Sequence, residues 1–225
     1  MIWLIFLLTM GISLWAAARV KGNYARYSKM RTQSGITGEE VAQRILASAG
    51  IDDVEILATE SFLGDHYDPI HKRLVLSRAN FLGDSPAALG IAAHECGHAI
   101  QHKIAYAPLN WRMAAVGLVS FVNPVVTWLP ILGLGIGLAP HTVMTILAVG
   151  WGVIMLFNMI TLPVEFDASR RAKMILQKAG YVNAQEAVAV NKVLDAAALT
   201  YVAAFITSLL YMLYYLLPLL LGRRD

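Results

Sequence analysis

Residues 93–99 read Ala-His-Glu-Cys-Gly-His-Ala, and the fold to expect follows from the His-Glu-x-x-His pattern inside them. Two histidines four residues apart lie on one face of a helix, one turn apart, close enough to bind the same metal ion. Zinc binds imidazole nitrogen at about 2.0–2.1 Å, and a neighbouring carboxylate can take a proton from a water that the metal activates. The pattern therefore predicts a helix that offers His94 and His98 as zinc ligands and Glu95 as general base.

Local signals give this helix its ends and its packing. Ser85 is a good N-cap and Pro86 suits the first helical position, so we expect the helix to run from there to about Ala105. Cys96 points about 200° away from His94, which predicts packing in the core and not metal binding. It is the only cysteine, so no internal disulfide forms.

The segment before this helix predicts a small amount of β-structure. Residues 54–57 and 73–77 are short and β-compatible, and residues 64–69 form a cluster of turn-forming residues. We expect a hairpin or mini-sheet, which either holds an extended substrate at its edge or is structural only. Further upstream, Thr37 and Glu40 predict a capping box at the start of a helix that Gly50 closes.

The composition indicates an integral membrane protein. Apolar residues make up 57% of the 225 residues, and the mean hydropathy is +0.57. About 20 apolar residues cross the hydrocarbon core of a bilayer. Four stretches reach that length, namely residues 2–20, 113–138, 142–164 and 196–221. In the last of them, Tyr201 and three further tyrosines are candidate interfacial anchors.

The distribution of basic residues predicts the orientation in the membrane. No basic residue precedes the first apolar stretch, which favours a retained anchor over a cleaved signal peptide. Of the 18 Lys and Arg residues, eleven lie between residues 19 and 112 and five between 170 and 192. The positive-inside rule places segments 21–112 and 165–195 in the cytoplasm and both termini outside, in the plasma membrane. The whole chain, residues 1–225, is then one membrane-embedded unit.

The net charge of +3 and the pI near 9.0 follow from this bias. They favour an anionic membrane surface as the neighbour, and the sequence has no nucleic-acid motif. The oligomeric state does not follow from these features.

A catalytic zinc needs a third protein ligand, and Glu165 is the first choice. It lies where the third apolar stretch ends, on the same predicted side as the histidines, and a carboxylate there is costly unless it is paired or bound to metal. Asp167 is the second choice, whereas Glu186 already has a predicted role in a capping box with Asn183 at the start of the last helix. His102 continues the histidine row, but about 12 Å separates residues eight apart on a helix.

The His-Glu-Cys-Gly-His segment at 94–98, followed by Glu165 within Pro-Val-Glu-Phe-Asp-Ala-Ser-Arg at 163–170, resembles the YugP-like family of bacterial membrane zinc metallopeptidases. The resemblance covers essentially the whole chain, including the turn at 65–69. More distantly, the chain is similar to the HtpX and Ste24 membrane peptidases, whose third ligand is the Glu of a Glu-Phe-x-Ala-Asp segment. The resemblance implies zinc as cofactor and Glu165 as ligand. Ser169 stands where those relatives have Asp.

The predicted fold is thus mainly α, with four transmembrane helices and a zincin-like cytoplasmic part. The predicted function is zinc-dependent endopeptidase action on proteins or peptides at the cytoplasmic membrane face. His66, Tyr67 and His102 are candidates for stabilising the oxyanion. Two alternatives stay open: a site-2-type protease that cleaves inside the bilayer, and a non-catalytic scaffold or partner subunit that zinc stabilises.

Overall fold

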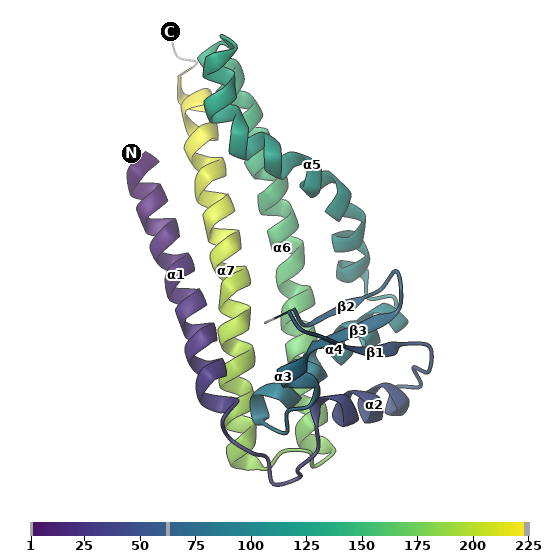
Figure 1. Cartoon of the computed structure of the whole chain (residues 1–225). Helices are drawn as coiled ribbons and strands as arrows, with labels where there is room; N and C mark the ends of the chain where they lie inside the picture. Colours follow the sequence, from purple (N-terminus) through teal and green to yellow (C-terminus); the bar gives the residue numbers. More distant parts are fainter. Residues whose placement is uncertain (1, 62–63, 223–225) are drawn as a thin grey trace.

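A computed structural model describes residues 2–61 and 64–222, and long helices form most of the protein (Figure 1). Four of them are long and apolar enough to cross a bilayer: α1 (Ile2–Tyr27), α5 (Ala107–Gly135), α6 (Pro140–Lys178) and α7 (Ala184–Leu221). The start of α1 and the end of α7 lie at one end of the bundle, and the sheet and the shorter helices lie at the other (Figure 1). Each of the four predicted apolar stretches falls largely within one of these helices.

The four long helices pack in a row. α7 packs against α1 and α6, and α6 packs in turn against α5. α5 contains Pro124 and Pro130 and bends along its course (Figure 1), as expected where proline removes a helical hydrogen bond. Gly150 of α6 faces Val126 of α5, where an added Cβ would lie 2.5 Å from a valine methyl group. This glycine therefore sets how closely α5 and α6 approach.

The helices extend beyond the apolar stretches that predicted them. α1 continues to Tyr27, and α5 begins at Ala107 instead of residue 113. The predicted span 142–164 is part of a longer helix, α6, which continues to Lys178 and contains Pro163. Hydropathy marks where polar residues begin and not where a helix ends, so the apolar stretches do not give the bounds of these helices.

A three-stranded sheet lies beside α4 (Figure 1). Its strands are β1 (Glu55–Thr59), β2 (His66–Asp68) and β3 (Arg73–Ser77), in the order β1-β3-β2. β2 and β3 form an antiparallel hairpin, and β1 runs parallel to β3. The mini-sheet is confirmed, but residues 64–69 are more than a turn because three of them form β2.

Three shorter helices complete the polar end of the molecule: α2 (Gly38–Ser48), α3 (Arg78–Phe81) and α4 (Pro86–Lys103). The predicted capping box of Thr37 and Glu40 starts α2, and the Ser85 hydroxyl accepts a hydrogen bond from the Ala88 amide at the start of α4. α4 ends two residues before the predicted position, because Ala105 has a left-handed backbone with φ of 50°.

α4 is the central element of the polar end. It packs against α2, α6 and α7, and Leu74 and Leu76 of β3 are completely buried in the same core. Cys96 also lies in this core, with its sulfur 3.7 Å from the carbonyl oxygen of Ala42. Burial raises the pKa of the Cys96 thiol well above its usual range, so the thiol is protonated. The predicted packing role of Cys96 is confirmed.

Candidate metal centre

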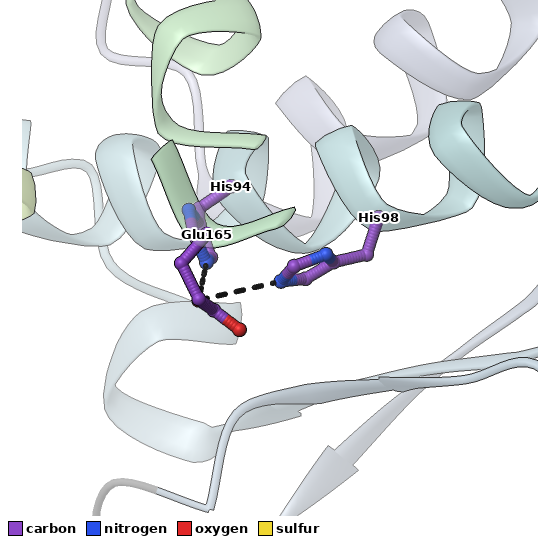
Figure 2. A group of neighbouring side chains, drawn as sticks. All are labelled: His94, His98 and Glu165. Carbon is purple, nitrogen blue, oxygen red and sulfur yellow. Dashed lines mark ion pairs between the residues drawn. The ribbon is translucent and has the colours of Figure 1, made fainter. Parts of the chain in front are cut away.

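α4 and α6 bring His94, His98 and Glu165 together, with the three side chains pointing toward one another (Figure 2). One possible ligand atom from each residue lies within 4.8 Å of the other two. Nε2 of His94 lies 3.3 Å from Oε2 of Glu165, and Nε2 of His98 lies 3.8 Å from the same oxygen. These are the three residues that the sequence analysis selected as ligands.

The spacing and chemistry of this group fit zinc. Two atoms that each lie about 2.0–2.1 Å from a tetrahedral zinc are roughly 3.4 Å apart, close to the separations found here. Glu165 is 1% exposed, and its Oε2 atom is buried without a hydrogen-bond partner. A buried carboxylate oxygen without a hydrogen bond is costly, and a cation between it and the imidazoles would satisfy it. Two histidines and one glutamate are also a known ligand set of catalytic zinc.

Gly97 allows α4 and α6 to come close enough to form the group. A Cβ atom at this position would lie 2.8 Å from the carbonyl oxygen of Ala168 on α6. Gly97 sits between the two histidines in the sequence, and Ala168 lies three residues after Glu165. The close contact of the two backbones therefore falls directly beside the candidate ligands.

A hydroxyl orients the first imidazole. Oγ of Ser169 lies 3.1 Å from Nδ1 of His94. An imidazole that binds a metal through Nε2 carries its proton on Nδ1, so Nδ1 would donate this hydrogen bond to the serine oxygen. Ser169 thus provides an orienting contact without the charge of an aspartate.

An amide orients the second imidazole. Nδ1 of His98 lies 3.0 Å from Oε1 of Gln101, which fits donation by the ring nitrogen. The Gln101 amide nitrogen donates to the carbonyl oxygen of Val164 at 2.8 Å and to Oδ2 of Asp167 at 2.9 Å. These two contacts fix the amide so that its oxygen faces His98. Both histidines can therefore present an unprotonated Nε2 to a metal ion that lies between them and Glu165.

Charge also shapes the site. Nη1 of Arg112, near the start of α5, donates to Oε1 of Glu165 at 2.7 Å. Burial alone would lower the pKa of His98, but the neighbouring Glu165 and Glu95 outweigh it and raise that pKa above its ordinary value. The Glu165 carboxylate is thus paired with the Arg112 guanidinium on one oxygen and lies beside His98 on the other.

The other predicted ligand candidates have different partners. Asp167 binds Arg170, Arg171 and Gln101 and lies outside the three-residue group. Glu186 caps α7, where its carboxylate accepts from the backbone amide of Asn183 at 2.8 Å. Both acids thus serve the fold around the site.

The candidates for oxyanion stabilisation also differ in their placement. The Tyr67 hydroxyl lies 2.9 Å from Nδ1 of His102, and His102 lines a separate polar cavity beside Asp53. His66 lines a cavity at the metal centre, and its Nδ1 lies 2.8 Å from the carbonyl oxygen of Gly64.

Two cavities meet at the candidate metal centre. One, of about 160 Å³, lies between α1, α4 and α7, and the other, of about 370 Å³, lies between β2, α4 and α5. His94, Glu95, Glu165 and Tyr201 line both of them. Glu95 is only 7% exposed, so it faces these cavities and not bulk solvent. A molecule in either cavity would contact the candidate ligands and base.

Tyr201 is a functional candidate that the sequence alone did not indicate. It was expected to be an interfacial anchor, but it lines both cavities and interacts electrostatically with Glu165 and Glu95. No motif marks it. The one available signal is its position near the start of the fourth apolar stretch, because that end adjoins the polar segment that contains Glu165.

The architecture and the His-His-Glu group together define a helical membrane protein with a peptidase-like zinc centre. Residues 2–220 match the model of a family described as "Putative neutral zinc metallopeptidase". The chain is also 40% identical to "Putative membrane protease YugP" of Bacillus subtilis (strain 168) over 221 residues, 96% of this chain and 95% of that protein. No solved structure matches the chain.

The chain belongs to this zinc metallopeptidase family. The predicted family and the predicted zinc cofactor are both confirmed. The family and the four long apolar helices also make it a multi-pass membrane protein.

Proposed function

We propose that this chain is a zinc-dependent endopeptidase that hydrolyses peptide bonds of proteins or peptides at the cytoplasmic face of the plasma membrane. One observation carries the proposal: the His94, His98 and Glu165 group lies where two cavities meet, and the buried Glu95 carboxyl lines both cavities. A ligand set, a base and space for a peptide on either side are what hydrolysis by a metal-activated water requires.

Each residue has a defined role in the proposed reaction. His94, His98 and Glu165 would hold the zinc, which when bound polarises a carbonyl group and lowers the pKa of a water molecule. Glu95 takes a proton from the attacking water and delivers it to the leaving amine. The Tyr201 hydroxyl donates a hydrogen bond to the substrate oxygen on which negative charge develops.

Strand β2 supports the binding of an extended substrate. It is at the edge of the sheet, paired with β3 on one side only among the described residues. His66 and Tyr67 of this strand line the larger cavity. A peptide that pairs with such an edge gains backbone hydrogen bonds that do not depend on its sequence. β2 would thus hold the substrate across the metal centre.

The proposed location follows from the basic residues, which are concentrated in segments 21–112 and 165–195. The start of α1 and the end of α7 lie at the same end of the bundle, as both termini outside would require (Figure 1). Ile70 is exposed next to β2, so a cysteine placed there reports the side of the sheet. Labelling by a membrane-impermeant thiol reagent in intact cells would contradict a cytoplasmic site.

The structure favours this proposal over its alternatives. A site-2-type protease carries its histidine pair within a span, but α4 is not among the four candidate spans, and its partner here is Glu165. A purely structural zinc site has four protein ligands, whereas the described part of the chain offers a group of three. Three ligands leave one position for water.

The decisive experiment compares three variants of the purified full-length protein in detergent. Glu95→Gln should keep stoichiometric zinc and lose proteolysis, because it removes the base but no ligand. Glu165→Ala should lose zinc and activity together. Glu55→Gln, which changes an exposed acid on β1, is the control and should keep both. Cleavage by Glu95→Gln, or full zinc content in Glu165→Ala, would overturn the proposal.

A further inference from the structure

The smaller cavity at the metal centre has an apolar wall built by α1, α4 and α7. We call it the apolar cavity. Its wall consists of Val20, Ile91, Val193, Leu194, Ala197 and Ala198. None of these side chains offers a hydrogen bond, so the wall favours an apolar occupant.

The apolar cavity is continuous with the reacting centre. The rest of its lining is polar and includes the candidate ligands and base: Tyr24, Asp65, His94, Glu95, Glu165, Ser169 and Tyr201. A group inside it is therefore next to the candidate ligands and base, as the side chain beside a scissile peptide bond must be. A lipid chain, or a part of a partner far from the scissile bond, would have no reason to lie beside the candidate ligands and base.

The size of the cavity matches one large side chain. Its volume is about 160 Å³, and a dry apolar cavity of about 150 Å³ in another protein holds a benzene molecule. A leucine, methionine or phenylalanine side chain fits such a space, while an alanine side chain leaves most of it empty.

We infer that the apolar cavity is a specificity pocket that takes one large apolar side chain of the substrate, immediately beside the bond that is cleaved. This inference rests on the proposed endopeptidase function and names its substrate class: peptides with leucine, methionine or phenylalanine at that position. Val20 and Ala197 lie at the sheet-side ends of the apolar stretches of α1 and α7. The pocket therefore holds its occupant where the spans meet the polar segments.

The larger cavity imposes a weaker selection. Its volume is about 370 Å³, and its lining includes His66, Tyr67 and Arg112 as well as apolar residues. Polar and charged side chains find partners there, so the substrate position on that side of the bond should tolerate many residues. Selectivity is thus expected on one side of the scissile bond only.

The first test measures cleavage of peptides that differ at one position beside the scissile bond. The wild-type protein should cleave the leucine peptide at least about tenfold better than the alanine peptide. The loss of even one methylene group from an apolar pocket lowers the rate of cleavage by about this factor. Ala197→Leu fills the pocket and should reduce this preference at least tenfold. Val20→Ala enlarges it and should shift the preference from leucine toward phenylalanine.

A matched control and zinc analysis separate this effect from misfolding. Ala204→Leu makes the same change on the same helix at an exposed position outside the cavity, and should keep the wild-type preference. Zinc content reports whether each variant has kept its metal centre. Unchanged preferences in Ala197→Leu and Val20→Ala, both with full zinc content, would overturn the specificity pocket.

A binding measurement distinguishes failure of the pocket from failure of the proposed function. Phosphinic peptides mimic the tetrahedral intermediate and carry a variable side chain on either side, and their dissociation constants can be measured on the zinc-loaded Glu95→Gln variant. We expect leucine to bind at least about tenfold tighter than alanine on one side only. Binding without such a preference would overturn the pocket alone. If this variant binds none of the phosphinic peptides and the wild type cleaves none of the peptide substrates, both the endopeptidase proposal and the pocket are overturned.

Discussion

Glu165 uses its two carboxylate oxygens differently. Oε1 accepts the short hydrogen bond from Arg112, and Oε2 faces the histidines without a hydrogen-bond partner of its own. The arginine therefore fixes the plane of the carboxylate and leaves one oxygen free for a cation. Such a contact explains how a single acid near the end of an apolar stretch can be both buried and available.

Tyr201→Phe should lower kcat at least about tenfold while zinc content stays at the wild-type level. The change removes only the hydroxyl that donates to the developing negative charge, an interaction that is present in the transition state and absent from metal binding. Peptide cleavage and metal analysis on the same preparation measure the two effects. Tyr215→Phe, which changes a tyrosine outside both cavities, should have no effect. An unaltered kcat in Tyr201→Phe would remove this residue from the reaction.

The sequence predicted the three residues that meet at the candidate metal centre, but not the residues that contact them there. The spacing of His94 and His98 is a local property of one helix, and the position of Glu165 follows from the cost of a carboxylate at the end of a span. Arg112 and Tyr201 reach the site only through the packing of α5 and α7. No spacing rule within one element contains that information.

The close contact between the helices α4 and α6 holds the candidate ligands together. Gly97→Ala should reduce zinc content and destabilise the protein by about 1–3 kcal/mol, because the new Cβ would overlap the carbonyl oxygen of Ala168 and push the helices apart. Since this carbonyl belongs to the backbone, no side-chain rotation relieves the overlap. Metal analysis and thermal unfolding measure the two losses.

Gly117→Ala is the matched control for this prediction. Gly117 lies in α5, and a Cβ atom there would meet nothing within 4 Å. The control should keep its zinc and its stability, because alanine favours a helix more than glycine does. Equal zinc contents in the two variants would show that the close contact at Gly97 does not shape the site.

How well each helix or strand could be predicted depended on whether its signal lies within a few residues of the sequence. The capping residues Thr37 and Asn183 act within a few residues of chain, and both helices begin where the sequence predicted. α6 could not be delimited in this way, since hydropathy changes near Val164 while the helix continues to Lys178. β2 was hidden because its three residues pair with β3 through a tight turn, and turn-forming residues dominate the segment.

For the whole molecule, zinc retention should depend on pH. Metal binding requires neutral imidazoles, and the raised pKa of His98 in the metal-free protein means that protons compete with zinc at a higher pH than for an ordinary histidine. Zinc affinity should therefore be full at alkaline pH and begin to fall, as the pH decreases, above the ordinary histidine pKa of about 6.5. Zinc content after dialysis at graded pH measures it. Constant content between about pH 8 and pH 5 would contradict the prediction.

His98 and Glu165 are separated along the chain by the hairpin of α5 and α6, two of the four helices that could cross a bilayer. A nascent chain that ends before this hairpin is inserted carries two of the three donors and no complete centre. All three donors can come together only after Glu165 has been synthesised and α5 and α6 have entered the membrane. A metal centre assembled in this order stays incomplete until the chain has been synthesised past Glu165.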